Sequence, residues 1–183
     1  MNEDERQAIH ILIGFVFLAL LILSGRINTL YILSAGLILG LVLIHLFISG
    51  IRVPVASWFF DKFERKNVLP GYGSLWYVVG CIFILSISQN VNLICAVFFI
   101  LALGDGFATI IGSRGKMKLF YNKKKTFEGT LAFAVSSLPA LFFLPSIVCF
   151  VAIIVSAFAE SLDLGIDDNF IIPFVCCLVF FIL

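Results

Sequence analysis

Hydrophobic residues along the chain gather into long runs that are separated by short polar segments. The runs approach the length that a helix needs to cross a bilayer, and they do not alternate polar and apolar residues as barrel strands do. Because a helix satisfies its own backbone hydrogen bonds inside lipid, each run is predicted to be a helix. The seven predicted helices cover residues 8–24, 29–49, 72–88, 91–111, 127–144, 146–160 and 169–183.

Composition places the chain among integral membrane proteins. Hydrophobic residues make up 62% and charged residues 13% of the 183 residues, against roughly 45–50% and about 25% in soluble domains. The five cysteines lie inside apolar runs without a CxxC pair, so we interpret them as small core residues. The predicted fold is all-α: a polytopic transmembrane bundle of about seven helices that forms one integral membrane domain over residues 1–183.

Positive charge is unevenly distributed between the two sets of loops. With seven spans, the N-terminus and the loops at 50–71, 112–126 and 161–168 lie on one side of the membrane. Of the 12 lysines and arginines, only Arg26 falls on the other side. The positive-inside rule therefore predicts a cytoplasmic N-terminus, with the polar motifs of these loops facing the cytosol.

The fourth run ends in LGDGFATIIG, which combines small residues with one carboxylate. Gly104, Ala108 and Gly112 recur every four residues and predict close packing against a neighbouring helix. Asp105 is an ionisable group near the hydrocarbon, where charge is costly and usually serves a site. We therefore expect a functional role for Asp105 rather than a solvated helix end.

A basic loop, GSRGKMKLFYNKKK, leads directly into the fifth run. Thr126 is predicted to cap that helix, so that the amides after it and the adjacent lysines form an anion site, and Gly129 would let a phosphate approach the backbone. Taken alone, the loop could equally be a topology anchor, and it contains no P-loop or dinucleotide fingerprint. The predicted nucleotide-binding residues are Arg114, Lys123, Lys124, Lys125, Thr126 and Gly129.

Carboxylates concentrate at the start of the fifth run and in the segment AESLDLGIDDN. Glu128 could simply cap its helix, where the helix dipole favours a negative charge, and the acidic segment could simply be a solvated loop. Crowded carboxylates repel one another unless a cation is held among them, and hard oxygen ligands suit Mg²⁺. The predicted metal ligands are Asp105, Glu128, Glu160, Asp167 and Asp168.

Arg6 and His10 lie four residues apart near the start of the first run, so they share a helix face. We predict that they contact a lipid headgroup or a phosphate, with a structural role as the alternative. A lysine-rich helix start, a carboxylate cluster and a membrane surface are together the parts needed for chemistry between a nucleoside triphosphate and a lipid.

Three ordered motifs, LGDGFATIIGSRGK, NKKKTFEGTLAF and AESLDLGIDDNFIIP, resemble the CTP-dependent polyprenol kinases, the family of dolichol kinase and phytol kinase. The resemblance covers residues 102–173, with weaker echoes in ERQAIH and FERKNVLPGYGSLWY. The first two motifs also resemble the phosphatidate cytidylyltransferases, but the glycine- and histidine-containing ending of those enzymes is not visible here. The resemblance therefore favours the kinases.

The resemblance implies transfer of the γ-phosphate of CTP to the hydroxyl of a polyprenol- or dolichol-type alcohol, with Mg²⁺ as the cofactor. In this hypothesis Lys124 and Lys125 hold the triphosphate, and Asp105 holds the metal together with Asp167 or Asp168. The expected catalytic residues are Asp105, Asp168 and Lys125, with Asp105 the first choice for the base.

The expected partners are CTP, the lipid alcohol and membrane lipids, and no nucleic acid is expected to bind. The sequence is compatible with a homo-oligomer. The alternative functions are a cytidylyltransferase, a diacylglycerol kinase and a small membrane transporter.

Overall fold

The computed structural model describes residues 3–63, 69–162 and 164–183, and every named element within these residues is helical. The elements are α1 (Glu3–Ile48), α2 (Pro54–Phe63), α3 (Tyr72–Ile87), α4 (Val91–Phe99), η1 (Ile100–Asp105), α5 (Gly106–Gly112), α6 (Phe127–Ser137), η2 (Leu138–Phe142), α7 (Ile147–Ser161) and α8 (Asp168–Ile182). The prediction of an all-α bundle is confirmed.

Each of the seven predicted helices has a helical counterpart, and the main departures from the prediction are a merged first helix and one additional short helix. The first two predicted helices are the two arms of α1, which meet at a kink where Gly25 has a φ of 80° and a ψ of 166°. A residue with this positive φ must be permissive, and glycine provides that freedom. The short helix α2 lies inside the segment that was predicted as the 50–71 loop.

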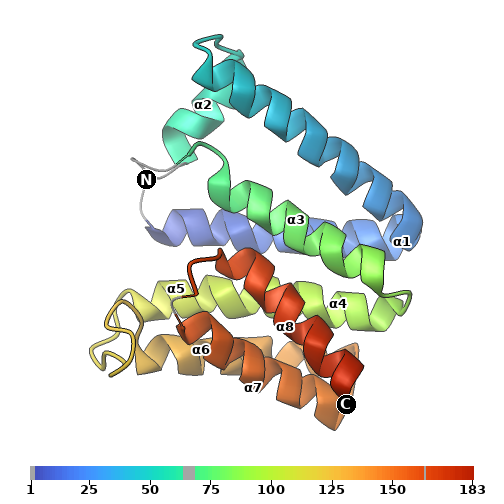
Figure 1. Cartoon of the computed structure of the whole chain (residues 1–183), viewed down its shortest axis with the longest axis vertical. Coiled ribbons are helices and arrows are strands. Elements are labelled where there is room, and N and C mark those ends of the chain that lie inside the picture. The colour runs from blue at the N-terminus through green and yellow to red at the C-terminus, as the bar shows by residue number, and fades with distance from the viewer. Residues whose placement is uncertain (1–2, 64–68, 163) are drawn as a thin grey trace.

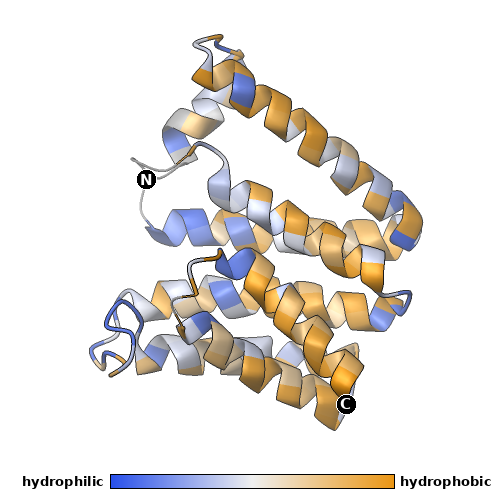
Figure 2. Cartoon of the chain, in the orientation of Figure 1, coloured by the Kyte–Doolittle hydropathy of each residue, from blue (hydrophilic) through white to orange (hydrophobic). Residues whose placement is uncertain are grey.

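The helices run back and forth so that the polar connections gather at one end of the bundle (Figure 1). The start of α1, the loop between α5 and α6 and the connection between α7 and α8 lie at the left of this view, and the kink at Gly25 and the C-terminus lie at the right. Arg26 directly follows this kink in the sequence, and its guanidinium donates a hydrogen bond of 2.6 Å to the carbonyl of Leu85 near the end of α3. Figure 2 shows the long apolar stretches between these two ends.

Two helical segments, Glu3–Ile48 and Val91–Gly112, are long and apolar enough to cross a membrane. The second is the centre of the bundle, because residues such as Ile94, Ile100 and Leu101 are fully buried. In contrast, α1 exposes many large hydrophobic side chains, including Leu23, Tyr31 and Ile38. This pattern is consistent with a membrane protein.

The small-residue face predicted on the fourth run packs against α6. A β-carbon on Gly104 would lie 2.6 Å from the Ser137 hydroxyl, and one on Gly112 would lie 3.3 Å from the Cα of Gly129. The close contact is therefore confirmed. Gly104 belongs to the π-helical segment η1, which ends at Asp105, and such turns within α-helices are rare and frequently found at functional sites.

Candidate active site

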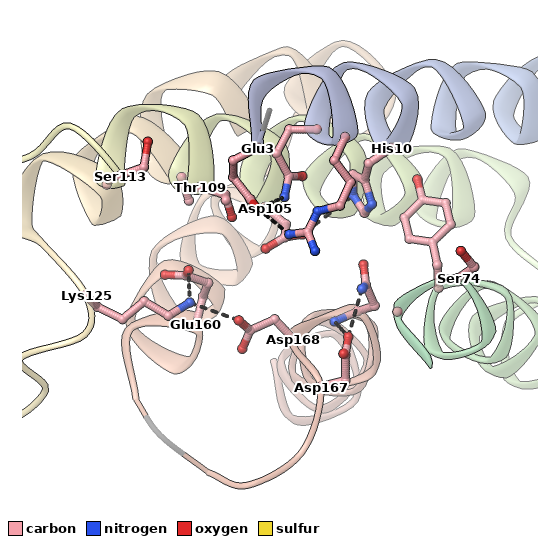
Figure 3. A pocket seen from close by; sticks show the side chains of 18 of the residues that line it. Glu3, His10, Ser74, Asp105, Thr109, Ser113, Lys125, Glu160, Asp167 and Asp168 are labelled. Atoms are coloured by element: carbon pink, nitrogen blue, oxygen red, sulfur yellow. Dashed lines mark hydrogen bonds and ion pairs between the residues drawn. The ribbon is translucent and has the colours of Figure 1, made fainter. Parts of the chain in front are cut away.

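Three carboxylates from three separate elements meet at the polar end of the bundle. Asp105 ends η1, Glu160 lies in the last turn of α7, and Asp168 begins α8. One carboxylate oxygen from each residue lies within 4.8 Å of those chosen from the other two, and Figure 3 shows the three side chains converging on one cavity. Asp105 and Glu160 are buried, so the group needs a compensating positive charge.

Lys125 supplies a positive charge to two of these carboxylates. Its ammonium pairs with Glu160 and lies 2.9 Å from an oxygen of Asp168. Burial alone would lower the pKa of Lys125, but the charges of Glu160 and Asp168 outweigh burial and raise the pKa above its usual range. Lys125 is therefore a fixed cation at neutral pH.

Side-chain contacts of the basic loop hold Lys125 in this position. The amide of Asn122 donates a hydrogen bond of 2.9 Å to the carbonyl of Ser161, and the Tyr121 hydroxyl lies 2.7 Å from the Ser161 hydroxyl. The loop is thus attached to the end of α7, one residue after Glu160. The loop and α7 are far apart in sequence, so this attachment could not be read from local patterns.

A cavity of about 1010 Å³ opens beside the carboxylates. Its lining includes Lys118, Lys124 and Lys125, the three carboxylates, and residues of α1 and α3. Figure 3 shows Lys125 and Glu160 on one side of the cavity, and His10 of α1 and Ser74 of α3 on the other. Such a volume lies at the upper end of the range typical of small-molecule sites. It is therefore large enough for a nucleotide and part of a second substrate.

His10 lies next to Asp105 on the α1 side of the cavity. Its Nε2 is 3.6 Å from Oδ2 of Asp105 and 3.5 Å from the carbonyl of Leu101. The imidazole also meets Tyr77 edge-on, with the ring centroids 4.3 Å apart. Arg6, its predicted companion, lines the same cavity and pairs with Glu3. His10 is thus placed in the carboxylate site, a position that its spacing from Arg6 did not indicate.

Two predicted metal ligands have other contacts in the structure. Glu128 accepts hydrogen bonds from the amides of Lys116 at 2.9 Å and Met117 at 3.1 Å, and it lies outside the group of three carboxylates found among the described residues. Asp167 is the N-cap of α8 and accepts hydrogen bonds from the backbone and side chain of Asn169. Asp167 still lines the cavity.

The predicted cap at Thr126 is confirmed, since its hydroxyl accepts a hydrogen bond from the amide of Gly129 at 3.2 Å. The amide of Phe127 donates to the carbonyl of Met117 at 2.9 Å. Two of the amides expected to bind phosphate are therefore already in use. Packing, rather than the approach of a phosphate, explains why a glycine is needed at position 129. A β-carbon there would lie 2.9 Å from the backbone of both Ala108 and Gly112.

The other predicted nucleotide-binding residues divide into two groups. Lys124 and Lys125 line the cavity, whereas Lys123 and Arg114 are not among the described residues that line it. Arg114 pairs with Asp4 at the start of α1. The cavity lining also includes residues that were not singled out from the sequence, among them Gln7, Tyr77 and Lys118. For Gln7 the available signal was its spacing of three residues from His10 on one helix face.

Comparison with known proteins gives three relatives. The chain is 32% identical over 182 residues to a Methanocaldococcus jannaschii protein described as uncharacterised, covering 98% of this chain and 93% of the relative. It is 32% identical over 206 residues to the chloroplastic farnesol kinase of Arabidopsis thaliana, covering 97% of this chain and 64% of that protein. It is 27% identical over 200 residues to the probable chloroplastic phytol kinase 3 of Glycine max, covering 96% and 61% respectively.

The chain therefore spans somewhat less than two thirds of each kinase-named relative. No protein-family model and no solved structure matches the chain. Two of these relatives are named as kinases of isoprenoid alcohols.

Proposed function

Because the chain belongs to the same family as the Methanocaldococcus jannaschii protein and is homologous over nearly all its length to a farnesol kinase and a probable phytol kinase, we propose that it phosphorylates an isoprenoid alcohol. The proposed phosphate donor is CTP, which is inferred from the resemblance of the three sequence motifs to CTP-dependent polyprenol kinases. The proposed acceptors are farnesol- and phytol-like alcohols, and longer polyprenols or dolichols remain within the same chemical class.

One observation carries this proposal: three carboxylates and a lysine from separate elements meet in one cavity at the polar end of an apolar bundle. A soluble nucleotide can approach such a site from water, while a lipid reaches it from the bilayer. Phosphoryl transfer depends mainly on alignment and charge neutralisation. The lysines and carboxylates supply both.

The donor set also suits Mg²⁺, which prefers carboxylate oxygens and retains water and phosphate ligands. Asp105, Glu160 and Asp168 would hold the ion, since each offers one oxygen within 4.8 Å of an oxygen of the other two. When bound, Mg²⁺ neutralises charge on the triphosphate. We assign Lys118, Lys124 and Lys125 to the phosphates, because all three line the cavity beside these carboxylates.

In the proposed reaction the acceptor oxygen forms a bond to the γ-phosphorus of CTP, and the bond from that phosphorus to the β–γ bridging oxygen breaks. The bridging oxygen keeps the electron pair and leaves with CDP. The hydroxyl proton passes to Asp105, a positioned base of the kind that contributes roughly 10²–10⁴-fold. The products are a lipid monophosphate and CDP.

We further propose that the chain is an integral membrane protein with this site facing the cytosol. The basic loop and the start of α1 lie at the same end of the bundle as the cavity, and basic loops are retained on the cytoplasmic side. The acceptor hydroxyl therefore needs to reach only the interface, and its chain can stay in the bilayer.

The test is to incubate the purified protein with CTP labelled on either the α- or the γ-phosphate. The acceptors are farnesol, phytol, geranylgeraniol, a polyprenol, dolichol and diacylglycerol. A kinase moves only the γ label to an alcohol. Transfer of the α label to a lipid phosphate, with release of pyrophosphate, would instead indicate a cytidylyltransferase. If neither label moves to any lipid, the proposal is wrong.

A further inference from the structure

The α1 and α3 side of the cavity takes no part in the phosphate chemistry proposed above. We call this surface the α1–α3 wall and define it by His10, Ile13, Phe17, Tyr77 and Val78, all of which line the cavity. Apart from His10, these residues present mainly aliphatic or aromatic surface. A triphosphate gains little from such a surface, whereas an isoprenoid chain removes apolar area from water when it packs there.

Asp105 connects this wall to the phosphate side. It lies 3.6 Å from His10 on the wall and within 4.8 Å of Glu160 and Asp168 on the other side. Figure 3 shows Asp105 between the Lys125–Glu160 pair and His10. A group held between His10 and Asp105 would therefore contact the apolar wall and the phosphate site together.

Along α1 the wall changes from polar to apolar, which matches an alcohol whose hydroxyl is followed by an apolar chain. On α1, Ile13 and Phe17 follow His10 by one and two helical turns, in the direction away from the charged end. Two turns correspond to roughly 10 Å. A hydroxyl at His10 would thus be continued by apolar contacts along the helix, towards the middle of the bundle.

Packing holds the wall in place before any ligand binds. Tyr77 is buried, stacks on Phe17 with ring centroids 5.7 Å apart and meets His10 edge-on. Behind it, Gly14 leaves no room for a side chain, because a β-carbon there would clash with the Tyr77 hydroxyl and with Ala102. The aromatic surface is therefore fixed by its neighbours, which reduces the entropy lost on binding.

We propose that the α1–α3 wall is the acceptor subsite. The hydroxyl of the isoprenoid alcohol lies between His10 and Asp105, where His10 positions it by a hydrogen bond, and the first isoprene units pack on Tyr77 and Phe17. This inference rests on the proposed function, since it assigns the second substrate of that reaction to a place in the cavity.

Photo-crosslinking tests the subsite without requiring turnover. The protein in nanodiscs is irradiated with a farnesol analogue that carries a diazirine on its second isoprene unit, and the labelled peptides are identified by mass spectrometry. We expect label that excess farnesol displaces in the peptides containing Ile13 to Phe17 and Tyr77 to Val78. Displaceable label found only elsewhere, for example in the second arm of α1, or no displaceable label at all, would overturn the proposal.

A matched pair of variants adds a kinetic test. Val78→Trp should fill part of the cavity beside the α1–α3 wall. It should therefore raise KM for farnesol about tenfold or more while leaving KM for CTP unchanged, as expected when only one substrate loses binding energy. Val42→Trp, at an exposed position on the second arm of α1, is the control and should leave both constants unchanged. Equal increases in both KM values for Val78→Trp would contradict an acceptor subsite.

The two proposals fail in different ways. If the wild-type protein transfers no phosphate but the crosslinks map to the wall, the wall binds the lipid and the kinase assignment is wrong. If phosphate is transferred but the displaceable crosslinks lie elsewhere, the kinase assignment stands and the subsite is wrong.

Discussion

At the residue scale, the charge balance of the site depends on Lys125. Its ammonium lies against Glu160 and Asp168, which would otherwise place two negative charges side by side. Removing one member of a buried ion pair leaves an uncompensated charge and costs more than the pair itself contributes. Lys125 therefore has a structural role in addition to the phosphate contact proposed for it.

Replacing Lys125 by methionine should lower the free energy of unfolding by about 1–3 kcal/mol. We expect less than the roughly 3–5 kcal/mol of a fully buried pair, because the side chains of Lys125 and Asp168 are 28% and 26% exposed. Mg²⁺ should restore more stability to this variant than it adds to the wild type, since the ion replaces the lost positive charge. Thermal unfolding in EDTA and in Mg²⁺ measures both effects.

The control is Lys123→Met, which removes an exposed lysine of the same loop. It should unfold like the wild type and respond to Mg²⁺ in the same way. An equal Mg²⁺ response of Lys125→Met and Lys123→Met would contradict a shared cation site.

The same contact predicts how the stability difference depends on pH. Because the folded state raises the pKa of Lys125, the stabilisation is complete below the unfolded-state pKa of about 10.4. It is lost only as pH rises through the higher folded-state value. The difference in unfolding temperature between the wild type and Lys125→Met should therefore stay constant from neutral pH to about pH 9. A difference that disappears within this window would argue against the ion pair.

At the element scale, the contact between α5 and α6 sets the position of the basic loop, which joins the two helices. The spacing of small residues on the fourth run predicted this contact, and the residue type at Thr126 predicted the start of α6, because both are local signals.

The position of His10 was not predicted, because it depends on how α1 packs against η1, a long-range contact without a local pattern. The π-helical turn before Asp105 was missed because residues 91–111 read as one continuous apolar helix.

Gly129→Ala tests this contact directly. The added β-carbon would lie 2.9 Å from backbone atoms of both Ala108 and Gly112, and backbone cannot move aside as a flexible side chain can. Overpacking of this kind costs about 1–3 kcal/mol, so the variant should unfold at a lower temperature than the wild type.

The matched control is Gly36→Ala, where a β-carbon would meet nothing within 4 Å. Alanine is preferred over glycine in a helix by about 1 kcal/mol, so this variant should be as stable as the wild type or more so. If both variants have the same stability, the close approach of α5 and α6 is not required for folding.

At the scale of the whole molecule, the alternation of runs and loops predicted which ends of the helices lie together. Four of the basic residues assigned to one side of the membrane line the cavity at the polar end: Arg6, Lys118, Lys124 and Lys125. Arg65 and Lys66, assigned to the same side, lie outside the described residues. Hydrophobic periodicity could not show which polar residues of this end share a cavity, since that depends on the packing of α1, α7 and α8 in three dimensions.

Single cysteines test the membrane topology. The five native cysteines are buried, so we expect little background labelling by a membrane-impermeant maleimide. Met117→Cys, in the basic loop, should react only after cells are permeabilised, whereas Gln89→Cys, between α3 and α4, should react in intact cells. Labelling of both positions from the same side would contradict the topology, and the reverse pattern would place the site outside the cytosol.

The most direct test of the site as a whole is γ-phosphate transfer from CTP to farnesol by purified wild-type, Asp105→Asn and Asp4→Asn proteins, measured side by side. Asp4 pairs with Arg114 at an exposed position, and such pairs contribute little to stability, so Asp4→Asn should keep most of the activity. Asp105→Asn keeps the size of the side chain and should lose at least about 10²-fold in rate while remaining folded. No transfer by the wild type, or equal transfer by the wild type and Asp105→Asn, would contradict a phosphotransferase site centred on Asp105.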